Sequence, residues 1–307
     1  MVNLLGYDVG GANTKAALVC VKKGKLLNAK VAVEYFPIWK KPEKLAEVLL
    51  KLKQQLGVSS LDGVGLTMTA ELSDVYQTKR EGVNHILSCV SKTFPDVPVF
   101  VLNTAVELVT LDSAKQDPLA VAAANWAATG WLVAKKIKNC VVVDVGSTST
   151  SIIPIVKSNV VALGKTDLDK LICGELVYTG SLRTNVAAIV NSIPIRNVVA
   201  GVASELFALS GDVNRVLGNI TKEDYSSEPV DGRGKTKLEG LARLARVVCA
   251  DTEMLTRQEI IKMAKYISDK QIQQVVEGLS KVYSYTKSLA LGKVPVVVTG
   301  LGKNFIA

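Results

Sequence analysis

The pattern of apolar and polar residues at the start of the chain predicts two strands joined by a glycine-rich turn. Residues 4–9 (LLGYDV) are apolar apart from Asp8, residues 10–15 (GGANTK) are small or polar, and residues 16–21 (AALVCV) are apolar again. Short apolar runs separated by glycines are typical of a β-hairpin. A further β-like segment at residues 25–36 extends this predicted sheet.

A helical pattern follows the first strands. In residues 42–57, Leu45, Val48, Leu49 and Leu52 recur at the spacing of one helix face. Short apolar runs at residues 61–69 and 97–103 then predict two more strands. An alanine-rich segment at about 116–136 predicts a long helix.

The opening pattern returns in residues 139–156 (NCVVVDVGSTSTSIIPIV), so the chain contains an internal duplication. Asp8, Gly10 and Thr14 recur as Asp144, Gly146 and Thr150. The duplication predicts two related α/β halves, residues 1–117 and 118–307. The second half should carry a helical insertion near 200–290, with helices at about 203–217, 237–248, 256–268 and 269–289.

Composition narrows the class of protein. The 307 residues are 48% hydrophobic, which favours a large core over disorder. The net charge of +9 comes from scattered lysines and arginines, and aromatic residues make up only 5%. We therefore expect a small anionic substrate rather than nucleic acid as the partner.

Several other classes are disfavoured. The longest uncharged stretch, between Asp117 and Lys135, is too short and too polar for a membrane span, and the N-terminus does not have the pattern of a signal peptide. The five cysteines form no C-x-x-C pair and His85 is the only histidine, which argues against zinc or disulfide frameworks. We expect a cytoplasmic protein with no membrane partner.

The duplicated turns are the strongest candidates for chemistry. Successive backbone N–H groups in a glycine-rich turn can hold phosphate oxygens, and short hydroxyl or amide side chains add donors. A third such turn follows the last predicted strand. The predicted phosphate-binding residues are Gly10, Gly11, Asn13, Thr14, Gly146, Ser147, Thr148, Thr150, Gly300 and Gly302. Asp8 and Asp144 could hold Mg²⁺ between the turns, and Lys15 could add a positive charge.

Three glycine turns in this order resemble those of the actin-like ATPase and sugar-kinase superfamily. The resemblance implies a two-domain ribonuclease H-like fold in which two hairpin turns hold phosphates across an interdomain cleft. It also implies ATP as a candidate ligand.

A narrower resemblance rests on a series of motifs in one order: GYDVGGANTK, PIWKK, TMTAELSD, AAANWAATGWLVAKK, DVGSTST, GELVYTGSLRTN and DGRGKTK. These are similar to the hydantoinase/oxoprolinase-related family linked to tetrahydromethanopterin-dependent one-carbon metabolism. The resemblance implies a transferase of methanofuran biosynthesis. Such an enzyme joins an aminomethyl-furanmethanol diphosphate to the phenol of γ-glutamyltyramine, with release of diphosphate.

The residues fit that chemistry, with the roles of single groups left open. Lys15 and Arg183 could contact the diphosphate, and Mg²⁺ on Asp8 and Asp144 would neutralise the charge of the leaving group. Glu71 and Glu175 are both candidates for the base that deprotonates the phenol. The same turns would also serve an ATP-dependent kinase or amide hydrolase, or a non-catalytic nucleotide-binding protein of actin-like fold.

Overall fold

The computed structural model describes residues 1–307, and the chain separates into two compact units. Unit 1 comprises Met1–Val133 with Lys165–Asp167, and unit 2 comprises Ala134–Gly164 with Leu168–Ala307. The division therefore lies near the end of helix α4 (Asn125–Ala134) rather than at the predicted boundary between residues 117 and 118. The reason is tertiary, because the segment after residue 117 is tied to unit 1: the Thr104 N–H donates to the Ala120 carbonyl.

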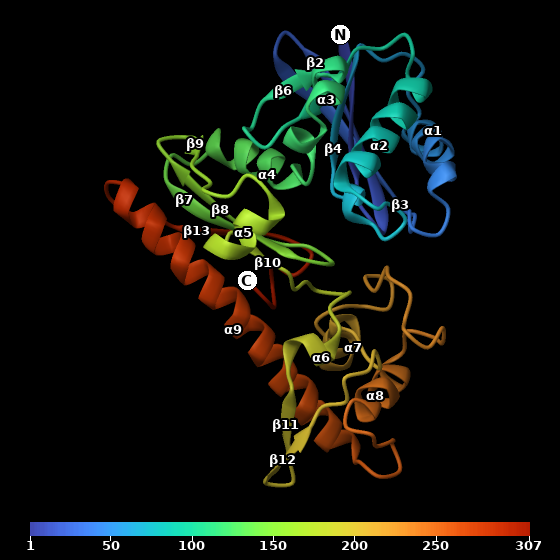
Figure 1. The fold of residues 1–307 in the computed structure, drawn as a ribbon, viewed down its shortest axis with the longest axis vertical. Coiled ribbons are helices and arrows are strands. Elements are labelled where there is room, and N and C mark those ends of the chain that lie inside the picture. Colours follow the sequence, from blue (N-terminus) through green and yellow to red (C-terminus); the bar gives the residue numbers. More distant parts are fainter. The chain divides into compact units, whose positions relative to one another are not determined.

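Unit 1 is built on a six-stranded sheet in the order β3-β2-β1-β4-β5-β6 (Figure 1). The first three strands form an antiparallel meander, and β4 and β5 continue the sheet parallel to β1. The strands are β1 (Val2–Val9), β2 (Asn13–Lys22), β3 (Lys25–Tyr35), β4 (Gly63–Met68), β5 (Val99–Leu102) and β6 (Leu108–Thr110). The helices are η1 (Pro42–Lys44), α1 (Leu45–Leu56), η2 (Ala70–Leu72), α2 (Lys79–Thr93), α3 (Leu111–Gln116), η3 (Pro118–Val121) and α4 (Asn125–Ala134).

The core of unit 1 forms where α1 and α2 pack against the sheet (Figure 1). The predicted face of α1 is confirmed, because Leu45, Val48, Leu49 and Leu52 are all buried. Alternate residues of β1 point into the same core, so Tyr7 and Val9 are buried on either side of Asp8. The predicted long helix at 116–136 is instead split into η3 and α4, with a left-handed residue, Ala123, between them.

Unit 2 contains a second sheet, ordered β10-β8-β7-β13 with β9 beside β8, and a separate β11–β12 hairpin. Its strands are β7 (Cys140–Val145), β8 (Thr150–Val156), β9 (Asn159–Val160), β10 (Leu176–Val177), β11 (Ser192–Ile195), β12 (Val198–Gly201) and β13 (Val296–Gly300). Its helices are α5 (Asp167–Cys173, whose first residue belongs to unit 1), α6 (Val186–Ile189), α7 (Ser210–Leu217), α8 (Lys237–Arg246) and α9 (Arg257–Leu289).

Helix α9 corrects the prediction of two late helices at 256–268 and 269–289. It runs without a break for 33 residues, from an N-terminal capping box made by Thr256 and Glu259. No glycine or proline lies at the predicted break between residues 268 and 269, and buried residues such as Ile267, Gln271 and Val275 continue one face through it. Figure 1 shows α9 extending from the β11–β12 hairpin to the β7–β8 sheet. No helix of the chain is both long and apolar enough to span a bilayer.

The duplication seen in the sequence is a duplication of structure. β7 and β8 form an antiparallel hairpin like β1 and β2, and β13 lies parallel to β7 as β4 lies parallel to β1. Each hairpin carries its aspartate next to the turn. The predicted α/β fold with two related halves is therefore confirmed.

Candidate functional site

In unit 1 the predicted phosphate turn closes tightly between β1 and β2. The Gly10 N–H donates to the Asn13 carbonyl at 3.0 Å. The following segment, which contains the PIWKK motif, is held against the same turn, because the Ile38 N–H donates to the Gly11 carbonyl at 3.0 Å. The turn is therefore shaped by main-chain bonds on both sides.

Asp8 stands at the end of β1 beside this turn. Its Oδ2 accepts a hydrogen bond from Lys15 Nζ at 2.9 Å, while its Oδ1 is buried without a hydrogen-bond partner. Thr67 is the register partner of Asp8 on β4, and its Oγ1 is also buried and unpartnered. Thr14, across the hairpin, is fully buried, and its Oγ1 is unpartnered too. Thr67 was not singled out from the sequence, because only the β1–β4 pairing brings it to Asp8.

The segment after β4 lies against the turn. The Thr69 N–H donates to the Val9 carbonyl at 2.9 Å, so the η2 helix begins directly beside the end of β1. A Cβ added to Gly11 would lie 3.3 Å from Ser73 Oγ. The TMTAELSD motif and the first glycine turn therefore lie against each other in unit 1.

Glu71 in η2 is a buried charged group of unit 1. Its side chain is fully buried, and neither carboxylate oxygen accepts a hydrogen bond of good geometry. Burial raises the pKa of Glu71 to about 7, against the opposing effect of nearby backbone N–H groups and of Lys79. A carboxyl group with a pKa near 7 can both take up and release a proton at neutral pH.

Two groups absent from the sequence prediction surround Glu71. Lys79 Nζ lies 3.9 Å from Glu71 Oε1 and 2.5 Å from Asp167 Oδ2. Lys79 begins α2, whereas Asp167 comes from the short segment that returns to unit 1. Their separation of 88 residues in sequence hides this cluster from any local pattern.

In unit 2 the second predicted turn is closed by the GELVYTGSLRTN segment. The Leu182 and Arg183 N–H groups both donate to the Ser147 carbonyl at 3.0 Å, and Ser181 Oγ donates to the Gly146 carbonyl at 2.9 Å. A Cβ at Gly180 would lie 2.6 Å from the backbone of Thr148, so this approach requires glycine.

The polar side chains of that segment support the turn. Thr150 is fully buried and donates to the Thr179 carbonyl at 2.8 Å, and Arg183 Nη1 donates to Thr148 Oγ1 at 3.4 Å. Gln271 of α9 is also buried and donates to Thr179 Oγ1 and to the Gly180 carbonyl. Gln271 was missed from the sequence, since its position on a long helix carries no motif.

The third predicted turn joins the second. β13 pairs with β7 so that Thr299 lies opposite Asp144. Gly300 has φ +85, and a Cβ there would lie 2.6 Å from Asp144 Oδ1. The Gly302 N–H donates to the Val145 carbonyl at 3.0 Å. Two of the three predicted turns therefore meet within unit 2, whereas the first is in unit 1.

Glu175 has a different environment from Glu71. Its carboxylate accepts from the Leu163 N–H at 2.6 Å, the Gly164 N–H at 3.1 Å and Lys170 Nζ at 3.1 Å, all within unit 2. Both oxygens are thus occupied in holding a loop and a buried lysine. Of the two carboxylates considered as a base, Glu71 is the one whose oxygens are unpartnered.

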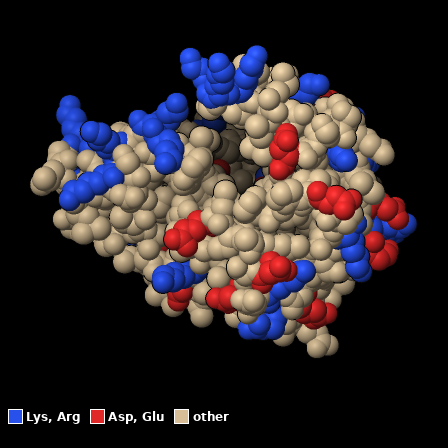
Figure 2. Space-filling model, turned by 90° about the horizontal axis from the view of Figure 1, so that it is seen from above, with Lys and Arg blue, Asp and Glu red and all other residues tan.

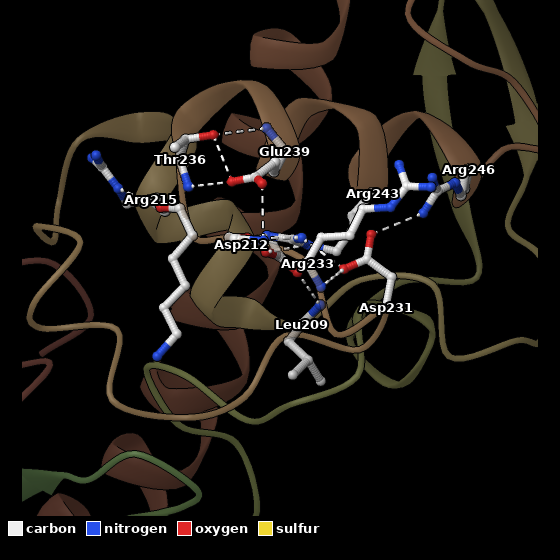
Figure 3. Close-up of polar contacts among 11 residues, drawn as sticks. Leu209, Asp212, Arg215, Asp231, Arg233, Thr236, Glu239, Arg243 and Arg246 are labelled. Carbon is white, nitrogen blue, oxygen red and sulfur yellow. Dashed lines mark hydrogen bonds and ion pairs between the residues drawn. The ribbon is translucent and has the colours of Figure 1, made fainter.

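The DGRGK motif is anchored by a buried ionic network (Figure 3). Arg243 of α8 is fully buried and contacts Asp212 of α7 at 2.8 Å and Asp231 at 3.0 Å. Arg246 adds a second contact to Asp231 at 3.3 Å. Lys235 donates to the Tyr225 carbonyl at 2.6 Å and is therefore part of the scaffold. The DGRGK motif is therefore a loop held in place by these ion pairs and hydrogen bonds rather than an unattached surface turn.

Charged side chains are spread over the surface. Figure 2 shows Lys and Arg side chains in several separate groups on one face, with Asp and Glu side chains among them on part of it. This distribution matches the scattered lysines and arginines of the sequence.

The donor set fits the Mg²⁺ expected at the turns. No cluster of three or more His, Cys, Asp or Glu side chains gathers in the chain. Protein-bound Mg²⁺ commonly uses only one or two carboxylates and completes its shell with waters and substrate phosphates. Asp8 meets this requirement, because its buried Oδ1 is available beside a phosphate-sized turn.

Comparison with known proteins defines the class. Residues 62–307 match the hydantoinase/oxoprolinase family. A solved structure of acetone carboxylase in its nucleotide-free form aligns over 91% of this chain and 63% of its own with a TM-score of 0.54, at 9% identity. The chain belongs to the hydantoinase/oxoprolinase family and shares its α/β fold with that carboxylase.

Two curated relatives are closer in sequence. A (4-{4-[2-(gamma-L-glutamylamino)ethyl]phenoxymethyl}furan-2-yl)methanamine synthase of Methanocaldococcus jannaschii is 40% identical over 99% of this chain and 88% of its own length. A protein of the same name from Methanococcus vannielii is 39% identical over 55% of this chain and 73% of its own length. The chain is thus an enzyme related to these synthases.

Proposed function

We propose that the chain catalyses the condensation of 5-(aminomethyl)-3-furanmethanol diphosphate with γ-glutamyltyramine. The phenol oxygen forms a bond to the methylene carbon beside the furan ring. The bond from that carbon to the diphosphate oxygen breaks, and its electron pair leaves with the diphosphate. The product is an aryl ether with the same groups that the name of the 40% identical relative describes.

Each unit carries a glycine turn suited to the phosphate groups of the leaving diphosphate. Lys15 brings positive charge to the turn of unit 1, and Arg183 brings it to the turn of unit 2. Mg²⁺ held by the aspartate beside a turn, Asp8 in unit 1 or Asp144 in unit 2, would neutralise the charge that develops on the departing diphosphate. The furan ring assists departure, because it delocalises positive charge at the adjacent carbon.

The surroundings of Glu71 are the main support for assigning it as the base that deprotonates the phenol. The phenol proton must leave as the ether bond forms, and Glu71 is a buried carboxylate with unpartnered oxygens beside the first turn. Its pKa of about 7 suits proton uptake near neutral pH. Glu175 is not chosen, because three donors already occupy its carboxylate.

The test compares two ligands and then measures turnover. Calorimetric titration with Mg²⁺ present should show binding of the furan diphosphate and weaker or absent binding of ATP. Added γ-glutamyltyramine should then release diphosphate in a one-to-one ratio with ether. Tight ATP binding with no response to the furan compound would instead favour an ATP-dependent enzyme of this fold.

A further inference from the structure

The cluster of Glu71, Lys79 and Asp167 has a geometry that the roles assigned above do not explain. The Lys79 ammonium lies between the two carboxylates but contacts Asp167 closely, at 2.5 Å, and Glu71 only at 3.9 Å. The side chains of Lys79 and Asp167 are 26% and 22% exposed, whereas that of Glu71 is fully buried. The buried carboxylate is therefore connected to the surface through one shared cation.

Stability does not account for this arrangement. A buried carboxylate without hydrogen-bond partners is a cost to folding, and a neutral glutamine of the same shape would avoid it. A partly exposed lysine–aspartate pair contributes little in return. A costly charge beside a phosphate turn is the pattern expected of a functional group.

Packing fixes the distance between Glu71 and Lys79. Gly82 of α2 lies directly against η2, where an added Cβ would be 2.5 Å from the Glu71 carbonyl oxygen. Lys79 precedes Gly82 by one helical turn, so the two residues share a face of α2. The backbone contact at Gly82 therefore holds Glu71 opposite the start of α2, where Lys79 stands.

Two charged groups on two elements have the largest electrostatic effects on Glu71. Lys79 on α2 lowers the pKa of Glu71, and Asp167 raises it, while burial is the largest effect. The third neighbour, the segment around η3, contributes no charge: the Ala123 backbone lowers the pKa of Glu71 slightly, without a hydrogen bond of good geometry to its oxygens. The charge state of Glu71 is thus set by a balance between one cation and one anion.

We propose that Lys79 and Asp167 are positioning residues for Glu71: the Lys79 ammonium favours the ionised carboxylate, and Asp167 holds that ammonium out of direct contact with Glu71, so that the carboxylate can accept a proton. This assignment rests on the proposed function of Glu71 as the base for the phenol.

Two substitutions should act in opposite directions. Lys79→Met removes the favourable cation, so Glu71 should bind its proton more tightly and the acid limb of the pH–rate profile should move up by about one pH unit. Asp167→Asn removes the anion and frees Lys79 to approach Glu71, so the acid limb should move down. Arg80→Met is the matched control, because Arg80 is exposed on the neighbouring position of α2 and should leave the limb unchanged.

The experiment combines the pH dependence of kcat/KM with an infrared titration of the protonated carboxyl band, assigned by its absence in Glu71→Gln. Opposite shifts for Lys79→Met and Asp167→Asn in both measurements support the proposal. Shifts in the same direction, or none in folded variants, overturn it. The infrared titration needs no substrate, so opposite shifts in a protein with no turnover of the furan diphosphate would overturn the proposed function alone. If Lys79→Met does not fold, Asp167→Asn and Lys79→Gln carry the test.

Discussion

Glu71 and Glu175 show how the surroundings of a single carboxylate decide its chemistry. Both are almost fully buried, and both lie in motifs that look equally promising in the sequence. Three donors satisfy Glu175, whereas the oxygens of Glu71 are unpartnered. Glu175 is therefore suited to holding the loop and Lys170 in place, whereas Glu71 is suited to proton transfer.

Replacing Glu71 by Gln should stabilise the protein in alkaline solution. The folded-state pKa of Glu71 is about 7, above the ordinary glutamate value of 4.5, so the folded state binds this proton more tightly than the unfolded state. That contribution to stability is present below about pH 4.5 and is lost as the pH rises through 7. Glu71→Gln should therefore unfold with a free energy about 3 kcal/mol higher than the wild type above pH 7.

Urea unfolding across a pH series would measure this difference. Glu71→Gln and the wild type should converge in acid, where Glu71 is protonated in both states. Glu175→Gln is the control, and it should lower stability because it removes the partner of the buried Lys170. A Glu71→Gln variant less stable than the wild type in alkaline solution would contradict the prediction.

Among the elements, helices α7 and α8 are connected by a buried ion pair, whereas helix contacts in a protein interior are usually apolar. Arg243 and Asp212 are both fully buried, and the same arginine holds Asp231 of the DGRGK loop (Figure 3). Burial raises the pKa of Asp212 against the opposing effect of Arg243. Such a pair is costly to assemble but defines one position for the loop.

Arg243→Met should destabilise unit 2 and release the loop. Asp212 would remain buried without its cation, which costs about 3–5 kcal/mol. The measurements are the urea midpoint and the rate of tryptic cleavage after Arg233, which should rise. Arg196→Met is the matched control, because its pair with Glu259 is exposed and its loss should change little. Equal stability of the two variants would refute the role of the buried network.

For the whole molecule, the central feature is that a single turn motif occurs twice. Each unit contributes one hairpin with an aspartate beside the turn, and unit 2 adds the turn at Gly300. The proposed reaction needs a phosphate-binding turn with a carboxylate beside it. Unit 1 supplies this combination at Gly10 and Asp8, and unit 2 supplies it at Gly146 and Asp144.

Single substitutions test the aspartate beside each turn. Asp8→Asn and Asp144→Asn should each abolish turnover without unfolding the protein, and each should weaken diphosphate binding roughly 10- to 100-fold. Calorimetry gives the affinities, and thermal unfolding confirms the fold. A folded variant that keeps wild-type turnover and diphosphate affinity would contradict the role of its aspartate.

Much of this enzyme follows from its sequence alone. Local periodicity predicts the hairpins and the buried face of α1, because neighbours in sequence form them. The recurrence of Asp8 and Gly10 as Asp144 and Gly146 predicts the two halves, and the order of motifs predicts the family. Each of these features can be predicted because it depends on the residue pattern within a short segment of the chain.

The tertiary structure decided which residues far apart in the sequence pack together and interact electrostatically. The unbroken α9, the division near Val133 and the buried Arg243 network depend on packing between segments far apart in the chain. The same holds for Glu71, whose pKa and neighbours follow from the contact of η2 with α2 and from the return of Asp167 to unit 1. Burial and long-range electrostatics leave no local pattern in a sequence, so only the folded chain distinguishes Glu71 from Glu175.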